Sequence, residues 1–347
     1  MNILGIESSC DETAASVVTD GHTVHSNLIS SQIAKHAAYG GVIPELAARE
    51  HLSNIKMVMD GALKDAEMTL DDIDAIAVTS EPGLLPALLV GTSYARGLAA
   101  SLGKPVVGVN HLTAHIYGAF IEKQELLEAQ NYPMIALLVS GGHTQIILVK
   151  EDGLCEIIGQ TIDDAAGEAY DKAAKILGLG YPGGPIIDKL AKKGNKKAID
   201  FPRPLMGAKL KGEHRYNFSF SGLKTALYYK VRNKEVTDTE MLDLIASYQE
   251  AIVDVLCKKA LMACQDHGAK NIVVAGGVAC NSQLRHDLTD RAQSLGITAT
   301  FAPPKYCTDN AAMIAALGYH QLKEQEGNGI DLETSPRSKT IIKMPFL

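Results

Sequence analysis

The strongest constraint on the fold is a pattern that occurs twice: two apolar segments that flank a short polar turn. Residues 2–18 contain the first copy, with its turn at 7–12, and residues 134–149 contain the second, with its turn at 140–144. Each copy predicts a pair of adjacent β-strands, because short apolar runs bounded by small or polar residues are typical of strands. The repetition predicts two similar lobes with a chain boundary near residues 129–132.

The segments that follow each copy alternate between strand and helix patterns. Apolar strands are expected at 75–79 and 105–109, and a helix is expected to begin at Pro44. This alternation predicts an α/β fold, and 347 residues exceed the ~250–300 at which a single core stops growing. We therefore expect an N-terminal lobe with a histidine pair, a C-terminal lobe with glycine-rich loops and a basic helical insert, and a polar tail (residues 1–131, 132–323 and 324–347).

The charge of the chain is unevenly distributed. A net charge of −7 argues against a protein that coats nucleic acid through bulk charge. Residues 189–234, however, contain thirteen Lys or Arg and two acids. Bases stack on aromatic rings beside phosphate-binding cations, and this basic segment carries such groups: Arg215, Tyr216, Phe218, Phe220, Tyr228 and Tyr229. The alternative is a solvated basic surface that has no partner.

The hydrophobic content and the cysteines indicate a soluble, cytoplasmic protein. Hydrophobic residues make up 46% of the chain, which is enough to bury a core and to exclude disorder as the main state. No apolar run reaches the ~20 residues of a membrane span, and the N-terminus does not resemble a signal peptide. The six cysteines form no CxxC pair and are expected to be reduced thiols. We expect no membrane partner.

Two histidines four residues apart are the first candidates for chemistry. His111 and His115 would share one face of a helix, where they could hold a metal ion or serve only as polar residues of that helix. Leu112 stands where a zinc protease of the HExxH type carries its glutamate base, which disfavours that class. Asp309 is the best third ligand, although it could instead cap the last helix. Two histidines and one carboxylate favour Fe(II) or Zn(II).

Glycine-rich turns are the second candidate. Turns at 140–142 and 276–281 each follow an apolar strand, so their backbone N–H groups could approach an anion. A single Gly-Gly turn is usually only a turn, but these two and a third loop at 180–184 together favour a nucleotide-binding cleft between the lobes. Asp171 lies on a flanking helix, where it could bind a ribose or remain a surface charge beside nearby lysines.

Together these residues closely resemble the tRNA adenosine threonylcarbamoyltransferase (TsaD-type) family, once described as O-sialoglycoprotein endopeptidases. The resemblance extends over residues 3–318. Its motifs, in chain order, are GIESSCDET at 5–13, HLTAH at 111–115, LVSGGHT at 138–144, EAYDK at 168–172, GGVACN at 276–281 and TDN at 308–310. Ordered motifs over nearly the whole chain make the resemblance specific.

The resemblance implies two duplicated RNase H-like lobes of the actin/hexokinase/Hsp70 superfamily, with a nucleotide cleft between them. It implies transfer of the threonylcarbamoyl group from threonylcarbamoyl-AMP to the N6 amine of the adenosine 3′ of the anticodon, in tRNAs that read codons beginning with A, with release of AMP. One divalent metal, Fe(2+) or Zn(2+), would be held by His111, His115 and Asp309. The adenylate, or an ATP- or AMP-type nucleotide, would contact Leu138, Val139, Ser140, Gly141, Gly142, Asp171, Gly184, Asp188 and Asn281.

The resemblance also places Asp11 and Glu12 where the family keeps acidic residues needed for activity. An exocyclic adenine amine is a poor nucleophile, because its lone pair is delocalised into the ring. The acyl donor must therefore be activated, and a mixed anhydride with AMP supplies the leaving group while a metal can polarise the donor. Glu12 or Asp11 is the candidate general base that takes the proton.

Partners follow from the same resemblance. Bacterial members act on tRNA together with a shorter paralogous subunit (TsaB-type) and a P-loop ATPase (TsaE-type), and a separate TsaC-type synthase supplies the adenylate. Archaeal and eukaryotic members use kinase-type partners instead. The basic segment predicts where tRNA would bind, and the candidate contacts are Lys192, Lys193, Lys196 and Lys197.

Two other functions stay open from the sequence. A sugar or small-molecule kinase of the same superfamily would have a similar nucleotide cleft, but it would not need a histidine pair. A nucleotide-binding scaffold without catalysis would have no chemical need for His111, His115 and Asp309 together.

Overall fold

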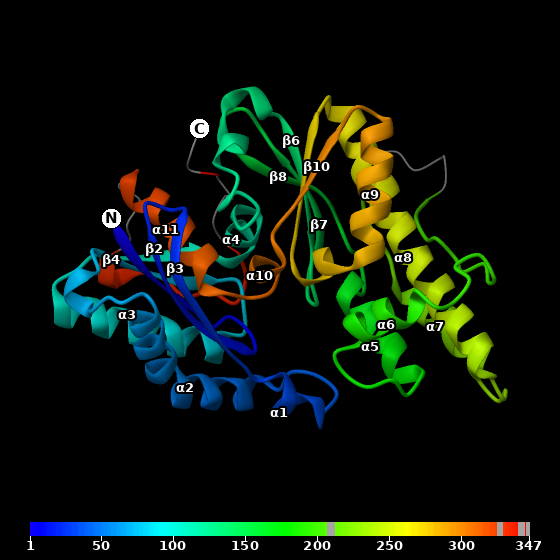
Figure 1. Ribbon diagram of the computed structural model, residues 1–347, viewed down its shortest axis with the longest axis horizontal. Coiled ribbons are helices and arrows are strands. Elements are labelled where there is room, and N and C mark those ends of the chain that lie inside the picture. The colour runs from blue at the N-terminus through cyan, green and yellow to red at the C-terminus, as the bar shows by residue number, and fades with distance from the viewer. Residues whose placement is uncertain (207–211, 325–328, 339–343, 345–347) are drawn as a thin grey trace. The chain divides into compact units, whose positions relative to one another are not determined.

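The computed structural model describes residues 1–206, 212–324, 329–338 and 344, and the chain forms two compact units (Figure 1). The first unit comprises Met1–Ala129, Asp152–Leu154 and the described residues of Thr308–Leu347. The second unit comprises Gln130–Glu151 and Cys155–Cys307. Each unit is built on a mixed sheet of five strands.

The sheet of the first unit has the strand order β3-β2-β1-β4-β5. Its strands are β1 (Asn2–Glu7), β2 (Glu12–Thr19), β3 (Thr23–Ser31), β4 (Ala75–Glu81) and β5 (Val106–Asn110). β1, β2 and β3 form an antiparallel meander, and β4 and β5 continue the sheet in parallel with β1. The predicted strand–turn–strand at residues 2–18 is therefore the β1–β2 hairpin.

The sheet of the second unit repeats this arrangement, with the order β8-β7-β6-β9-β10 when read from its antiparallel edge. Its strands are β6 (Met134–Val139), β7 (Thr144–Val149), β8 (Cys155–Gln160), β9 (Asn271–Ala275) and β10 (Thr298–Phe301). β6 pairs antiparallel with β7 and parallel with β9, as β1 does with β2 and β4. The predicted duplication of an α/β lobe is confirmed.

Helices cover both faces of the first sheet, as can be followed in Figure 1. Alternate side chains of a strand point to opposite faces. Leu4 and Ile6 of β1 pack on α2 (Pro44–Asp65) and α3 (Leu85–Leu102), whereas Gly5 faces α11 (Ala311–Lys323). Short elements complete the unit: α1 (Ile33–Ala37), α4 (His111–Tyr117), and the 3₁₀ turns Leu70–Asp72, Gln124–Leu127 and Gly329–Asp331.

Helix α11 does not lie in the lobe where it was expected, which was the C-terminal lobe of residues 132–323. This helix belongs to the first unit, because small residues let it lie directly on the first sheet. A Cβ built on Gly5 would stand 2.4 Å from the carbonyl oxygen of Ala311, and one on Gly318 would stand 2.4 Å from the Cβ of Ala77. Close backbone approach of this kind requires glycine.

The described part of the segment expected as a polar tail, 324–347, also packs on the first unit. Leu332 is buried in the cluster that contains Ile6 and Val78, and the backbone N–H of Ser335 donates to the carbonyl of Ser80 at 3.0 Å. An apolar side chain within the polar segment thus fixes it to the sheet. The remainder of that segment (325–328, 339–343 and 345–347) lies outside the described residues.

The second unit carries the helical insert between β8 and β9. The insert contains α5 (Ala166–Ile176), α6 (Gly183–Ala191), a 3₁₀ turn at Gly212–His214, α7 (Ser221–Val231) and α8 (Asp238–His267). After β9 come a 3₁₀ turn at Gly277–Cys280 and α9 (Ser282–Ser294), and α10 (Pro304–Cys307) follows β10. The 3₁₀ turn Ala129–Asn131 lies where the chain passes from the first unit to the second. The 30-residue α8 begins at a capping box made by Thr237 and Glu240 and ends at the left-handed Gly268. Within the described part of the chain, no helix is long and apolar enough to cross a membrane.

Candidate functional site

The histidine pair lies in the first unit, where β5 runs directly into α4. Asn110, the last residue of β5, caps the helix, since its side-chain oxygen accepts from the N–H groups of Leu112 at 3.0 Å and Thr113 at 3.1 Å. The cap fixes the first turn of α4, so His111 and His115 project from the same face one turn apart. Both imidazoles are buried.

Asp309 approaches this pair from the chain segment immediately before α11. Asn310, not Asp309, caps α11, because its side-chain oxygen accepts from the N–H of Met313 at 3.1 Å. The carboxylate of Asp309 is therefore free of that role. Its Oδ1 lies 3.2 Å from Nε2 of His115 and 3.5 Å from Nε2 of His111.

The three side chains present a donor set that fits a divalent metal. The two Nε2 atoms lie 3.1 Å apart, and one ligand atom from each of the three residues falls within 4.8 Å of the others. Ligand atoms bound at about 2.0–2.2 Å to one tetrahedral or octahedral ion are separated by roughly 3–3.5 Å. Nitrogen, nitrogen and oxygen at this spacing suit Fe(II) or Zn(II), so the residues predicted as ligands are brought together as a metal site requires.

Glu7 holds His111 in place, and the sequence analysis did not single it out. Its Oε2 lies 3.0 Å from Nδ1 of His111, and it also accepts from the hydroxyl of Thr79 at 2.6 Å. A carboxylate that accepts from one ring nitrogen fixes the tautomer and leaves the other nitrogen free to ligate. The available signal was a glutamate at the end of an otherwise apolar strand, because a fully buried carboxylate requires a partner.

The electrostatics of this cluster follow from burial and from the pairing of opposite charges. Burial alone would raise the pKa of Glu7, but the charge and hydrogen bond of His111 lower it. Burial disfavours the charged form of His111 and so would lower its pKa. The carboxylates of Glu7 and Asp309 outweigh this and raise the pKa of His111 well above its ordinary value. Burial and the nearby His111 lower the pKa of His115. His115 therefore stays neutral, as a metal ligand must be.

Asp11 and Glu12 lie at the start of β2, close to Asp309 in the same unit. Burial, with the negative charges of Asp309 and Asp11 adding to it, raises the pKa of Glu12 to about 9. The hydroxyl of Ser31 donates to Glu12 at 3.0 Å. Asp11 is buried. The two acidic residues thus share one environment, in which the charge at Asp309 influences the protonation of Glu12.

His51 on α2 contacts the residues that flank Asp11 and Glu12, and the sequence analysis did not single it out. Its Nε2 contacts the carbonyl of Cys10 at 3.0 Å, and its Nδ1 contacts the hydroxyl of Thr13 at 2.8 Å. The imidazole is fully buried, and burial lowers its pKa. Neutral His51 therefore bonds to the residues on both sides of Asp11 and Glu12.

The predicted nucleotide residues lie in the second unit, beginning at the β6–β7 turn. Leu138 and Val139 end β6, and the turn is closed by a bond from the N–H of Ser140 to the carbonyl of His143 at 2.8 Å. Gly141 and Gly142 are exposed, and a Cβ on either would meet nothing within 4 Å. The backbone at these glycines is therefore accessible, which is what an anion needs to approach N–H groups.

Asp171, Asp188 and Asn281 each form hydrogen bonds within the second unit, and Gln249 links the last two. Asp171 on α5 accepts from the N–H of Gly183 at 2.7 Å and so positions the start of α6, where Gly184 has open space around it. Asp188 on α6 accepts from Gln249 at 3.3 Å, and the side-chain amide of Asn281 donates to the oxygen of Gln249 at 2.8 Å.

Gln249 is a third residue that the sequence analysis missed. It lies inside α8, is buried, and bridges two of the predicted nucleotide residues. A glutamine in the middle of a long helix gives no pattern of its own, so only the fold identifies it.

The predicted stacking residues of the basic segment are mostly engaged elsewhere. The prediction that Phe218 and Phe220 offer stacking faces is wrong, since both are fully buried in the core. Arg215 donates to Asp266 at 2.7 and 2.9 Å, and the hydroxyl of Tyr216 donates to the same carboxylate at 2.6 Å. Tyr228 and Tyr229 remain exposed.

The four candidate lysines differ in their surroundings. Lys196 lies 3.0 Å from Glu250 and 3.3 Å from Asp287, and Lys192 lies 3.6 Å from Asp188. Lys193 and Lys197 are exposed and form no ion pair with any described residue. The unpaired positive charge of this group therefore lies at Lys193 and Lys197, whereas Lys209 and Lys211 of the basic segment fall outside the described residues.

Comparison with known proteins decides the family. A family model for TsaD, tRNA N6-adenosine threonylcarbamoyltransferase, matches residues 23–316. The chain belongs to this family. It is similar to the tRNA N6-adenosine threonylcarbamoyltransferase of Thermosipho africanus, at 49% identity over 98% of this chain and all of the relative. The relatives from Geotalea uraniireducens and Clostridioides difficile are 50% and 49% identical, over 97% of this chain and 96% and 97% of their own lengths.

Similarity to solved structures shows the fold of the TsaD-family chain. The (R)-2-hydroxyglutaryl-CoA dehydratase component A of Acidaminococcus fermentans is 15% identical with a TM-score of 0.53, over 93% of this chain and 99% of that one. HypF from T. kodakarensis is 15% identical with a TM-score of 0.58, over 93% of this chain and 48% of that one. The two lobes have the α/β fold of these proteins, as the resemblance implied. The chain is a transferase, a tRNA threonylcarbamoyltransferase.

Proposed function

We propose that this chain transfers the threonylcarbamoyl group from threonylcarbamoyl-AMP to the N6 amine of the adenosine 3′ of the anticodon, in tRNAs that read codons beginning with A, and releases AMP. The observation that carries the proposal is the convergence of His111, His115 and Asp309 in a chain of the TsaD family. A kinase or a nucleotide-binding scaffold of this fold has no chemical use for that donor set. The ligands would hold one divalent ion, Fe(2+) or Zn(2+).

When bound, the ion would supply a Lewis acid for the carbamoyl or phosphate oxygen. Burial is the main cause of the raised pKa of Glu12, and the charge of the ion would offset the smaller contribution that comes from Asp309 and Asp11. Glu7 keeps the Nε2 of His111 directed at the site by accepting from its Nδ1. His51 contacts the backbone carbonyl of Cys10 on one side of Asp11 and Glu12 and the hydroxyl of Thr13 on the other. The acidic residues are thereby fixed before the substrates arrive.

In the proposed reaction, a bond forms between the adenine N6 and the carbamoyl carbon, and the bond from that carbon to the phosphate oxygen breaks. The electron pair of the broken bond leaves with AMP. The proton lost by the amine goes to the carboxylate of Asp11 or Glu12, acting as general base. No oxidant, reductant or further reactant is needed for this balance.

We assign the adenylate to residues of the second unit. The accessible backbone of Gly141 and Gly142, next to Ser140 in the same turn, would receive its phosphate. Asp171 and Asp188 would accept from its hydroxyl groups, with Gly184 leaving room beside them. Leu138, Val139 and Asn281 complete the proposed contact set. Gln249 holds the side chains of Asp188 and Asn281 in place by a hydrogen bond to each.

Partners belong to the proposal as well. We infer that tRNA contacts the basic segment, through Lys193 and Lys197 more than through Lys192 and Lys196, because carboxylates already engage the latter two. A TsaB-type paralogue, a TsaE-type ATPase and a TsaC-type synthase that supplies the adenylate are the proposed protein partners, and the cytoplasm is the proposed location.

The test is transfer of labelled threonine to unmodified tRNA, with the synthase, the candidate partners and ATP present. The expected result is label on the adenosine 3′ of the anticodon, with one AMP released per group transferred. Labelled tRNA with the label elsewhere would refute the assigned position. Absence of transfer with every partner set, together with ATP-dependent phosphorylation of a sugar, would replace the proposal by the kinase alternative.

A further inference from the structure

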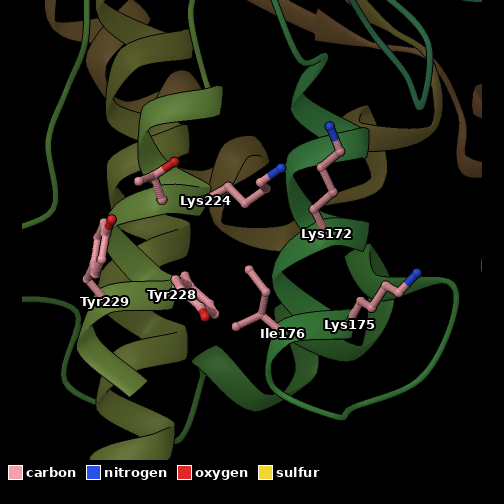
Figure 2. Close-up of a pocket in the computed structure, with 7 residues that line it drawn as sticks. Lys172, Lys175, Ile176, Lys224, Tyr228 and Tyr229 are labelled. Carbon is pink, nitrogen blue, oxygen red and sulfur yellow. The ribbon is translucent and has the colours of Figure 1, made fainter. Parts of the chain in front are cut away.

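A groove between α5 and α7 of the second unit has no role in the site described above. It encloses about 480 Å³, which lies within the range of small-ligand pockets, ~300–1,000 Å³. Its main lining side chains are Lys172, Lys175 and Ile176 from α5, and Lys224, Tyr228 and Tyr229 from α7. Figure 2 shows Lys224 and Tyr228 extending from α7 toward α5, with Ile176 extending from α5 toward them.

The charge of this groove is positive and largely uncompensated. None of the described residues that line it is acidic. Lys172 is held by Asp164 at 2.6 Å and by Glu168 at 2.9 Å, so its charge is neutralised. Lys175 and Lys224 form no ion pair with any described residue. Each wall helix therefore carries one free ammonium group: Figure 2 shows that of Lys224 directed toward α5, and that of Lys175 directed to the outer side of α5, away from α7.

The groove also offers an aromatic face. Tyr228 is 46% exposed and Tyr229 is 63% exposed, although most large apolar side chains of the unit are buried. The guanidinium of Arg232 lies 5.9 Å from the ring centre of Tyr228, which adds a cation beside the ring. The other aromatic residues of the basic segment are buried or bonded to Asp266, so stacking capacity is concentrated on α7.

We propose that this groove binds an unpaired nucleotide segment of the RNA substrate, with a base stacked on Tyr228 and phosphates near Lys175 and Lys224. Cationic walls with an exposed aromatic ring are the usual means by which proteins hold single-stranded nucleic acid. RNA is recognised mainly through such unstacked bases in loops and ends. The inference rests on the proposed function for its RNA substrate. The groove and the proposed adenylate site share helix α5, because this helix also carries Asp171.

Charge removal is the first test, made by fluorescence anisotropy with full-length protein and labelled unmodified tRNA at several salt concentrations. The Lys175→Gln/Lys224→Gln double variant should bind more weakly. Its log–log salt slope should be smaller in magnitude by about 1.4, because each phosphate contact to a single strand contributes ~0.7. Lys270→Gln is the matched control, an exposed lysine of the same unit that lies outside the groove, and it should bind as the wild type does.

Removal of the ring is the second test. Tyr228→Leu should weaken binding of an unpaired oligoribonucleotide by about fivefold or more, since stacking on one aromatic ring contributes at least ~1 kcal/mol. Tyr228→Phe keeps the ring and should retain wild-type affinity, which separates stacking from a general loss of structure. Thermal unfolding of each variant confirms that it is folded.

The outcomes separate this inference from the proposed function. If both the double lysine variant and Tyr228→Leu bind RNA with wild-type affinity, the proposal that the groove binds RNA is refuted, whatever the transfer activity. Free AMP that competes with the oligoribonucleotide at equal concentration, or an acidic peptide that does so, would also overturn it. Reduced RNA binding by these variants would support the groove even if wild-type protein failed to transfer threonine, a result that would refute only the proposed function.

Discussion

The β1–β2 turn of the first unit and the β6–β7 turn of the second occupy equivalent places in sheets of the same order and direction. The first is rich in carboxylates, with Glu7 at its start and Asp11 and Glu12 at its end. The second is Ser140-Gly141-Gly142-His143, without an acid. The two units thus share one frame but differ in the residues at these turns, which is why we propose a metal in the first unit and the adenylate in the second.

The strand ends beside these turns diverged in the same direction. In the first unit β5 leads into α4, which carries His111 and His115. In the second unit the equivalent strand β10 leads to α10, which carries Cys307 and no histidine. One packing device is nevertheless shared. Gly83 after β4 lies against Ser9, two residues beyond the end of β1, and Gly276 after β9 lies against Val139, the last residue of β6.

The largest effect should come from removing a metal ligand of the first unit. His111→Ala should lose bound metal and reduce transfer by about 100-fold or more, ~3 kcal/mol of barrier. Metal analysis of the purified protein and single-turnover transfer would measure this. His286→Ala is the control, because His286 is an exposed histidine of the second unit. Equal activity of His111→Ala and wild type would remove the functional contrast between the units.

The next effect concerns Glu7, the buried carboxylate whose counterpart at the end of β6 is Val139. Glu7→Gln keeps the shape but removes the negative charge that orients His111. Loss of such an outer partner lowers metal affinity by about 10–100-fold. Competition with a chelator measures that affinity. An unchanged affinity would show that Glu7 serves only to stabilise the fold.

The shared glycines predict a smaller effect, on stability. Gly276 has φ +91°, and a Cβ there would stand 2.3 Å from the carbonyl oxygen of Val139. Gly276→Ala should therefore lower the free energy of unfolding by about 2 kcal/mol or more. Gly141→Ala, where a Cβ meets open space, should change it by less than about 0.5 kcal/mol. Urea unfolding compares the two, and equal losses would contradict the packing argument.

The smallest effect should come from the surface charge of the second unit. Lys193→Gln/Lys197→Gln should weaken tRNA binding by a few-fold, and the log–log salt slope should fall by about 1.4–1.8. A matched pair in the first unit, Lys64→Gln/Lys123→Gln, removes the same charge from exposed positions and should leave binding close to wild type. Equal losses in both pairs would mean that tRNA senses only the total charge.

Much of this frame was predictable, because strand patterns and turn residues act locally. The repeated apolar–turn–apolar pattern predicted both hairpins, and the spacing of His111 and His115 predicted a shared helix face. The pairing of these histidines with Asp309 came from chemistry and resemblance, and the structure brings the three together.

What escaped prediction depends on contacts between distant segments. Phe218 and Phe220 lie in the basic segment, whose charge indicated an exposed surface, yet both point into the core. Gln249 gains its role only because α8 passes between Asp188 and Asn281. The return of α11 to the first sheet depends on the absence of a side chain at Gly5, and such an absence has no periodicity.

The packing of α11 on β1 has a consequence for how the chain folds as it is synthesised. β1 leaves the ribosome about 300 residues before α11, the helix that covers its Gly5 face, and before Asp309. The second unit is nearly continuous in sequence, so its contacts are available earlier. During translation the first unit therefore presents an uncovered sheet face and two metal ligands without the third. The three candidate metal ligands can come together only after Asp309 has been synthesised.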